Sequence, residues 1–93
     1  MKRFDWDIEK NKKLIKERNI SFEEIVIFIE QGNLLDIVDN PNPRYKHQKI
    51  FIIDIEGYVY TVPFLESAQS YFLKTIFPSR KATKEYLQEG EQA

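Results

Sequence analysis

The sequence contains no cysteine, a single histidine and only three isolated glycines among its 93 residues. The lack of cysteine excludes a disulfide scaffold, thiolate metal sites and a cysteine nucleophile. The glycines do not form a phosphate-cradling loop, and one histidine without cysteine argues against a structural zinc site. We therefore expect no metal ion and no cofactor.

Long apolar runs are also missing. The longest lie near residues 25–29 and 50–53, whereas a helix that spans a bilayer needs about 20 apolar residues. The N-terminal segment MKRFDWDIEKNKK lacks the apolar stretch of a secretory signal. We expect a cytoplasmic protein with no membrane partner. The length suits a single domain over residues 1–93.

Charge of both signs is present, and the formal net charge is −1 at pH 7. This balance argues against a non-specific nucleic-acid binder. The distribution is uneven, because residues 44–49 carry three basic side chains and residues 74–84 carry four, with no acid in either segment. Residues 23–39 carry five acids and no base. These segments are either ordinary solvated faces or parts of a binding surface.

The first part of the chain is predicted to be helical. Sparse apolar positions predict a surface helix over residues 8–18, after a short aromatic segment at residues 4–6 that suggests an edge strand. Ser21 and Glu24 form the S-x-x-E capping box that marks a helix start, and Gly32 suits the end of that helix. Since few residues join the two helices, we expect an antiparallel hairpin.

The rest of the chain is predicted to be mostly β. The segments typical of strands are 34–38, 48–55, 58–65 and 71–77. Pro63 within the third of these suggests an edge strand or a bulge. Ser79 predicts the cap of a final helix over residues 80–88, whose inward-facing residues are expected to be Ala82, Tyr86 and Leu87. The predicted fold class is α+β, with an N-terminal helical hairpin, a three- to four-stranded antiparallel sheet and a C-terminal helix.

Basic and aromatic side chains recur around the predicted sheet. Lys74 interrupts the apolar run YFLKTIF, and Arg80 lies at the junction of the last strand and last helix. His47 is the only histidine, the residue type most used for proton transfer in catalysis. These three are candidate catalytic residues for breaking an RNA phosphodiester, which needs proton transfer and stabilised charge on the phosphate oxygens. The candidate RNA-binding residues are Lys49, Lys46, Arg44, Tyr60 and Lys81.

Each candidate catalytic residue also has a structural interpretation. The Lys74 stem can lie along the sheet with its ammonium in water. Arg80 can form an ion pair with Glu85 or Asp36, and His47 can be an exposed loop side chain. The catalytic interpretation requires the basic groups to lie together, because each must reach the same phosphate.

Three motifs together resemble the BrnT family of type II toxins. The opening F-D-W-D-x-x-K-N-K, Phe4 to Lys12, is similar to the F-x-W-D-x-x-K with which the family opens. The segment N-I-S-F-E-E, Asn19 to Glu24, is similar to its G-I-S-F-E-E. The ending S-R-K-A-T, Ser79 to Thr83, is similar to its S-A-R-K-A-T. All three occur in the family's order across nearly the whole chain.

This resemblance implies a RelE-like α+β fold, a ribonuclease that needs no metal, and inhibition by a cognate ribbon-helix-helix antitoxin in a complex that represses its own operon. Arg80 is the firmest residue match. Lys49 stands where the family tends to have an arginine, and Lys74 has an approximate counterpart. The sequence also differs from the family pattern, for example with Arg18-Asn19 where the family has H-G and with Pro63 in the third predicted strand. These differences bear on the catalysis that the resemblance implies more than on the fold.

Two functions therefore remain open. In the first, the chain is a toxin that cleaves RNA, and the ends of Lys49, Lys74 and Arg80 should lie in one cleft within about 10 Å of each other. In the second, it is a non-catalytic protein-binding module that acts within an antitoxin or repressor complex. The expected partners are an antitoxin protein and RNA, in a homodimer or a toxin–antitoxin hetero-oligomer.

Overall fold

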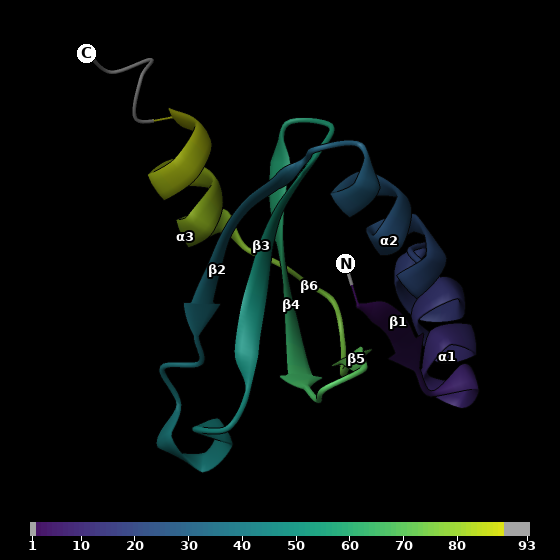
Figure 1. The fold of residues 1–93 in the computed structure, drawn as a ribbon. Coiled ribbons are helices and arrows are strands. Elements are labelled where there is room, and N and C mark those ends of the chain that lie inside the picture. The colour runs from purple at the N-terminus through teal and green to yellow at the C-terminus, as the bar shows by residue number, and fades with distance from the viewer. Residues whose placement is uncertain (1, 89–93) are drawn as a thin grey trace.

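A computed structural model describes residues 2–88 of the chain (Figure 1). It opens with strand β1 (Arg3–Trp6) and two helices, α1 (Ile8–Arg18) and α2 (Phe22–Glu30). Ser21 and Glu24 make both hydrogen bonds of the capping box at the start of α2. Asn19 ends α1 in the left-handed region, with φ at 57°, which asparagine adopts more readily than most residues. The predicted helices and their hairpin arrangement are confirmed.

One sheet contains β1 and five further strands, which are β2 (Leu34–Asp39), β3 (Lys49–Ile55), β4 (Tyr58–Glu66), β5 (Ser70–Leu73) and β6 (Phe77–Pro78). The strand order is β1-β5-β4-β3-β2, with β6 also paired to β4. All pairs are antiparallel except β1 with β5. The prediction of a three- to four-stranded antiparallel sheet was therefore wrong. The α+β class itself is confirmed.

The last predicted strand, 71–77, is interrupted in the structure. β5 ends at Leu73, and the chain crosses over residues 74–76 before β6 begins at Phe77. Pro63 is buried within β4, a central strand, and the β3–β4 register passes through it without a shift, so the edge or bulge expected there is absent. Its carbonyl accepts the main-chain N–H of Lys74 at 2.8 Å. In an antiparallel strand the N–H and C=O of one residue point to the same side. A residue with an N–H at position 63 would therefore direct it towards residues 74–76, where β5 has ended, so the N–H that proline lacks is not needed there.

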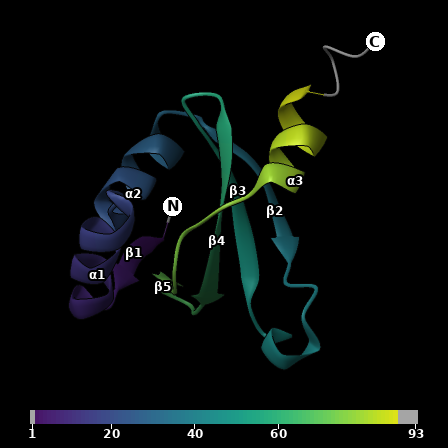
Figure 2. The ribbon, with the colours of Figure 1, turned by 180° about the vertical axis from the view of Figure 1, so that it is seen from behind.

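Two apolar clusters lie on opposite faces of the sheet (Figures 1 and 2). The larger one joins the helical hairpin to the sheet through residues such as Phe22, Phe51 and Phe64, and the last two rings stack with centroids 3.8 Å apart. The smaller cluster, of Ile52, Val59 and Ala82, lies under helix α3 (Arg80–Thr83). We call these the hairpin face and the α3 face.

The final helix begins as predicted, with the Ser79 hydroxyl accepting the N–H of Ala82. After α3, residues Lys84–Gln88 continue as a π-helix. Ala82 is buried and Leu87 packs against the smaller cluster, but Tyr86 is exposed and donates to Asp36 Oδ2 at 2.8 Å. The inward position expected for Tyr86 was wrong because a π-helix bonds i to i+5, which places Leu87 above Ala82. No helix within residues 2–88 could cross a bilayer.

Candidate functional site

The predicted cluster of Lys49, Lys74 and Arg80 is not formed. Lys49 pairs with Phe64, whose ring is buried on the hairpin face. Lys74 is bonded through its main chain to Pro63, one position away on β4. Because side chains alternate along a strand, Lys49 points to the hairpin face and Lys74 to the α3 face. The sequence could not show this, since it depends on the register of paired strands.

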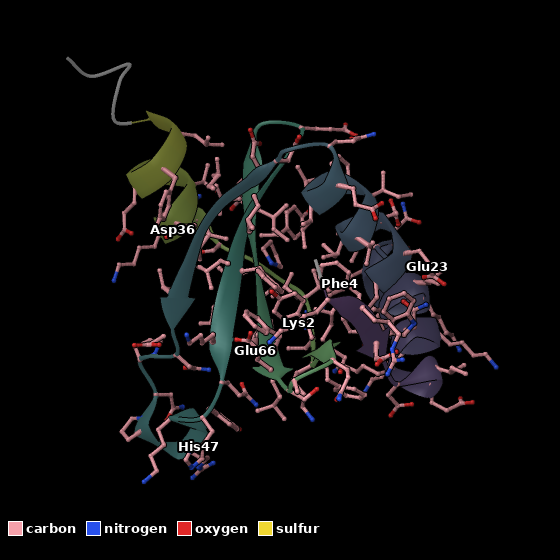
Figure 3. All side chains as sticks on the ribbon, viewed as in Figure 1. Lys2, Phe4, Glu23, Asp36, His47 and Glu66 are labelled. Atoms are coloured by element: carbon pink, nitrogen blue, oxygen red, sulfur yellow. The ribbon has the colours of Figure 1, made fainter. Side chains whose placement is uncertain are left out.

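Lys49 lies close to a carboxylate of the protein itself. The Lys2 ammonium donates to Glu66, two residues beyond the strand partner of Lys49 (Figure 3). This hydrogen bond holds the pKa of Glu66 below its ordinary value, with smaller electrostatic contributions from Lys2 and Lys49. Lys49 therefore belongs to a surface where basic charge already has an acidic neighbour.

Lys74 lines a cleft of about 300 Å³ together with a second lysine, Lys10 of α1. We call it the lysine cleft. Its remaining lining comes from the loop after β2, from β4 and from the segment that crosses to β6: Asn40, Tyr45, Gln48, Pro63, Thr75 and Phe77. Within residues 2–88, none of the residues that line it is acidic and neither lysine takes part in an ion pair.

The Thr75 hydroxyl gives this cleft an unused hydrogen-bonding group. Its Oγ1 is buried and has no hydrogen-bond partner, the single case among the described side chains. A buried hydroxyl without a partner costs free energy. The Lys74 ammonium lies 5.4 Å from the centre of the Phe72 ring and has no acidic partner within residues 2–88. The charge of the residues that line the lysine cleft therefore suits a phosphate group.

A second cleft has a volume of about 430 Å³ and shares one lining residue, Phe77, with the lysine cleft. We call it the arginine cleft, and its other lining residues are Arg18, Ile20, Tyr60, Ile76 and Pro78. The Arg18 guanidinium lies 5.1 Å from the centre of the Phe77 ring and also donates to the Ile76 carbonyl. Lys10, Leu14 and Arg18 are spaced by four along α1, which puts them on one helix face.

The other predicted residues lie in three different places. Tyr60 lines the arginine cleft. The loop residues Arg44, Lys46 and His47 are exposed, and His47 lies at the far tip of the loop between β2 and β3 (Figure 3). Only Asn40, Tyr45 and Gln48 of this part of the chain line the lysine cleft.

Arg80 and Lys81 are exposed at the start of α3, and neither lines the lysine cleft or the arginine cleft. The N–H of Ser79 bonds to the carbonyl of Val59, four residues along β4 from the partner of Lys74. That offset is about 13 Å along a strand. The alternative of an ion pair from Arg80 to Glu85 or Asp36 is not seen within residues 2–88 either.

Four cleft residues were missed by the sequence reasoning: Lys10, Arg18, Thr75 and Phe77. A signal existed for the first two, since Lys10 closes the W-D-x-x-K of the opening motif and both basic residues flank Leu14 at helical spacing. Thr75 and Phe77 read as ordinary strand residues.

Comparisons of this chain with protein-family models, with curated proteins and with solved structures found no match. Within residues 2–88, no group of three or more histidine, aspartate and glutamate side chains is placed to hold a metal ion. The features of this chain that point to a function are therefore the geometry of the two clefts and the three motifs.

Proposed function

We propose that this protein is the toxin component of a type II toxin–antitoxin pair, with a RelE-like fold, and that it cleaves RNA without a metal ion. One observation carries the chemistry. Two lysines from distant parts of the chain, Lys10 and Lys74, line one cleft beside an unpartnered Thr75 hydroxyl, and no acid lines it within the described residues. The resemblance to BrnT motifs suggests the biological class, and with it a cognate antitoxin.

The proposed reaction is internal transfer of the phosphodiester. The 2′-oxygen attacks the neighbouring phosphorus as it loses its proton, a P–O2′ bond forms, and the bond from phosphorus to the 5′-oxygen breaks. The products are a 2′,3′-cyclic phosphate and a 5′-hydroxyl. Negative charge grows on the non-bridging oxygens, where preorganised ammonium groups stabilise the transition state.

Each candidate has a position in this scheme. Lys74 and Lys10 contact the reacting phosphate, and an ammonium group of the cleft gives a proton to the departing 5′-oxygen. His47, the single histidine of the sequence, lies at the tip of the loop between β2 and β3 (Figure 3) and is the proposed acceptor of the 2′-hydroxyl proton. Arg80 follows Ser79, whose main chain is offset from that of Lys74 by about 13 Å along β4. It therefore suits a phosphate further along the RNA strand, which a guanidinium can bind in a bidentate manner.

The test uses the purified chain and a short single-stranded RNA in the presence of EDTA. We expect cleavage with cyclic-phosphate ends, and no cleavage where the nucleotide before the scissile bond is 2′-deoxy. Expression of the chain alone should arrest bacterial growth. Intact RNA after prolonged incubation, together with normal growth at confirmed expression, would refute the proposal.

The outer edge of β2 favours a second candidate, the non-catalytic protein-binding module. β2 pairs only with β3 in the described sheet, and Leu35 and Ile37 are 39% and 46% exposed. An exposed strand edge with apolar side chains can accept a partner strand. If this is the function, Ile37→Ser should weaken binding to the product of the neighbouring gene. Lys74→Ala should leave both this binding and bacterial growth unchanged.

A further inference from the structure

We infer that the arginine cleft binds an unpaired guanine base of the RNA whose phosphate lies in the lysine cleft. Arg18, Tyr60 and Phe77 would then determine which base the protein accepts. This inference rests on the proposed function and adds a base preference to it.

Continuity between the clefts is the first argument. Phe77 belongs to the lining of both, so the two clefts are neighbours that share this residue. The phosphate and the base of a nucleotide are joined through one sugar, and a ligand with an anionic end and a flat end therefore matches two clefts with one common wall. The lysine cleft supplies the cations, and the arginine cleft supplies the aromatic surfaces.

The second argument is the chemistry of the arginine cleft. Its walls are the rings of Tyr60 and Phe77 and the apolar side chains of Ile20, Ile76 and Pro78. Phe77 is 44% exposed, although a ring of this size is normally covered in a core. Aromatic side chains stack on unpaired bases in RNA recognition, so this exposed ring is suited to a base.

Arg18 determines which base fits best. Its guanidinium is held over Phe77 and bonded to the Ile76 carbonyl, which uses one of its five N–H donors. The donors that remain in the plane of the group match two neighbouring acceptors. Guanine presents such a pair, O6 and N7, and arginine binds it in a bidentate manner. Adenine offers a donor at the position of O6 and should bind less well.

The experiment measures binding, so that its outcome is independent of cleavage. Fluorescence anisotropy is recorded with short single-stranded RNA analogues whose 2′-hydroxyls are replaced by fluorine, so that they cannot be cleaved, and that differ at one nucleotide: guanine, adenine, cytosine, uracil or 7-deazaguanine, which lacks N7. We expect guanine to bind at least about 5-fold more tightly than the others, in line with the discrimination of a bidentate arginine contact. Equal affinity for all five overturns the inference.

Two variants sharpen the test. Arg18→Met keeps a long side chain but has no donor, and should bind guanine and adenine equally. Phe77→Leu should weaken binding to every base by roughly 5-fold or more, because base stacking is lost. Lys16→Ala, an exposed lysine on α1, is the control for loss of a positive charge, and thermal melting verifies that each variant is folded. A guanine preference that survives in Arg18→Met would also overturn the assignment.

The two proposals fail in different ways. A base preference in binding, combined with no cleavage of ribose RNA, would remove the nuclease and keep the base site. Cleavage of RNA with no base preference would keep the nuclease and remove the base site.

Discussion

The hairpin face and the α3 face of the sheet use lysine differently. On the hairpin face, Lys49 lies near Glu66, which is already bonded to Lys2. On the α3 face, Lys74 shares a cleft with Lys10 and an unpartnered hydroxyl. The apolar cluster is large on the first face and small on the second. Neither cleft belongs to the α3 face alone, since the lysine cleft takes Lys10 from α1 and the arginine cleft takes Ile20, Ile76 and Tyr60 from the larger apolar cluster. The faces therefore differ in whether a lysine has an acidic neighbour, and both contribute to the space that a ligand could enter.

The largest expected effect concerns the stability of the hairpin face. Phe51→Ala should lower the free energy of unfolding by about 3–5 kcal/mol, since its buried ring stacks on Phe64. Ile52 is the adjacent residue and lies on the α3 face. Ile52→Ala should lower the free energy of unfolding by less, about 2 kcal/mol. Urea denaturation of the two variants measures both values. If Ile52→Ala costs as much as Phe51→Ala, the two faces do not differ in packing as described.

The next effect concerns catalysis on the α3 face. Lys74→Ala should lower the rate of RNA cleavage by about 100-fold or more, the usual result of removing one group that stabilises transition-state charge. Lys16→Ala, which removes the same charge from an exposed site on α1, should leave the rate unchanged. Single-turnover cleavage assays give both numbers. A Lys74→Ala protein that cleaves at the normal rate would disprove the role of this cleft.

A smaller effect is expected at the helix that covers the α3 face. The Ser79 hydroxyl accepts the N–H of Ala82, so Ser79→Ala should cost about 1 kcal/mol of stability through the lost cap. Ser79→Asp keeps an acceptor and should restore most of it. Thermal melting separates the two variants. Equal melting temperatures for all three proteins would show that this cap contributes nothing.

The smallest effects are those of pH on stability. The bond at Tyr86 should lose its contribution at alkaline pH, and the bond at Glu66 at acidic pH. The hydrogen bond to Asp36 raises the pKa of Tyr86 above its ordinary value. Its contribution is therefore complete below about pH 10 and is lost as the pH rises through the folded-state pKa. The stability difference between the wild type and Tyr86→Phe should disappear in alkali. A difference that persists there would contradict the assigned hydrogen bond.

Glu66 on the hairpin face should behave in the opposite sense. The Lys2 hydrogen bond lowers its pKa, so its contribution is complete above about pH 4.3 and is lost as the pH falls through the folded-state pKa. The comparison of wild type with Glu66→Gln across the acid range measures this. The difference in free energy of unfolding between the wild type and Glu66→Gln should become smaller only as the pH falls into the acid range.

The helices could be predicted from the sequence because their signals are local. Ser21 and Glu24 are three residues apart, and Ser79 lies at the very start of the helix that it caps. The sheet could not be predicted completely, because β1 pairs with β5 near the other end of the chain. Lys49 and Lys74 were placed together because both are basic and near strands. Their opposite directions follow from strand register, which charge patterns do not reveal.

The parallel pairing of β1 with β5 has a consequence for the timing of synthesis. Arg3 pairs with Ser70, so β1 stays without its neighbour until β5 has left the ribosome. Lys10 likewise can line a cleft with Lys74 only after residue 74 has emerged. Contacts between such distant segments form late, so the edge of the sheet and the lysine cleft are completed together, after the helices.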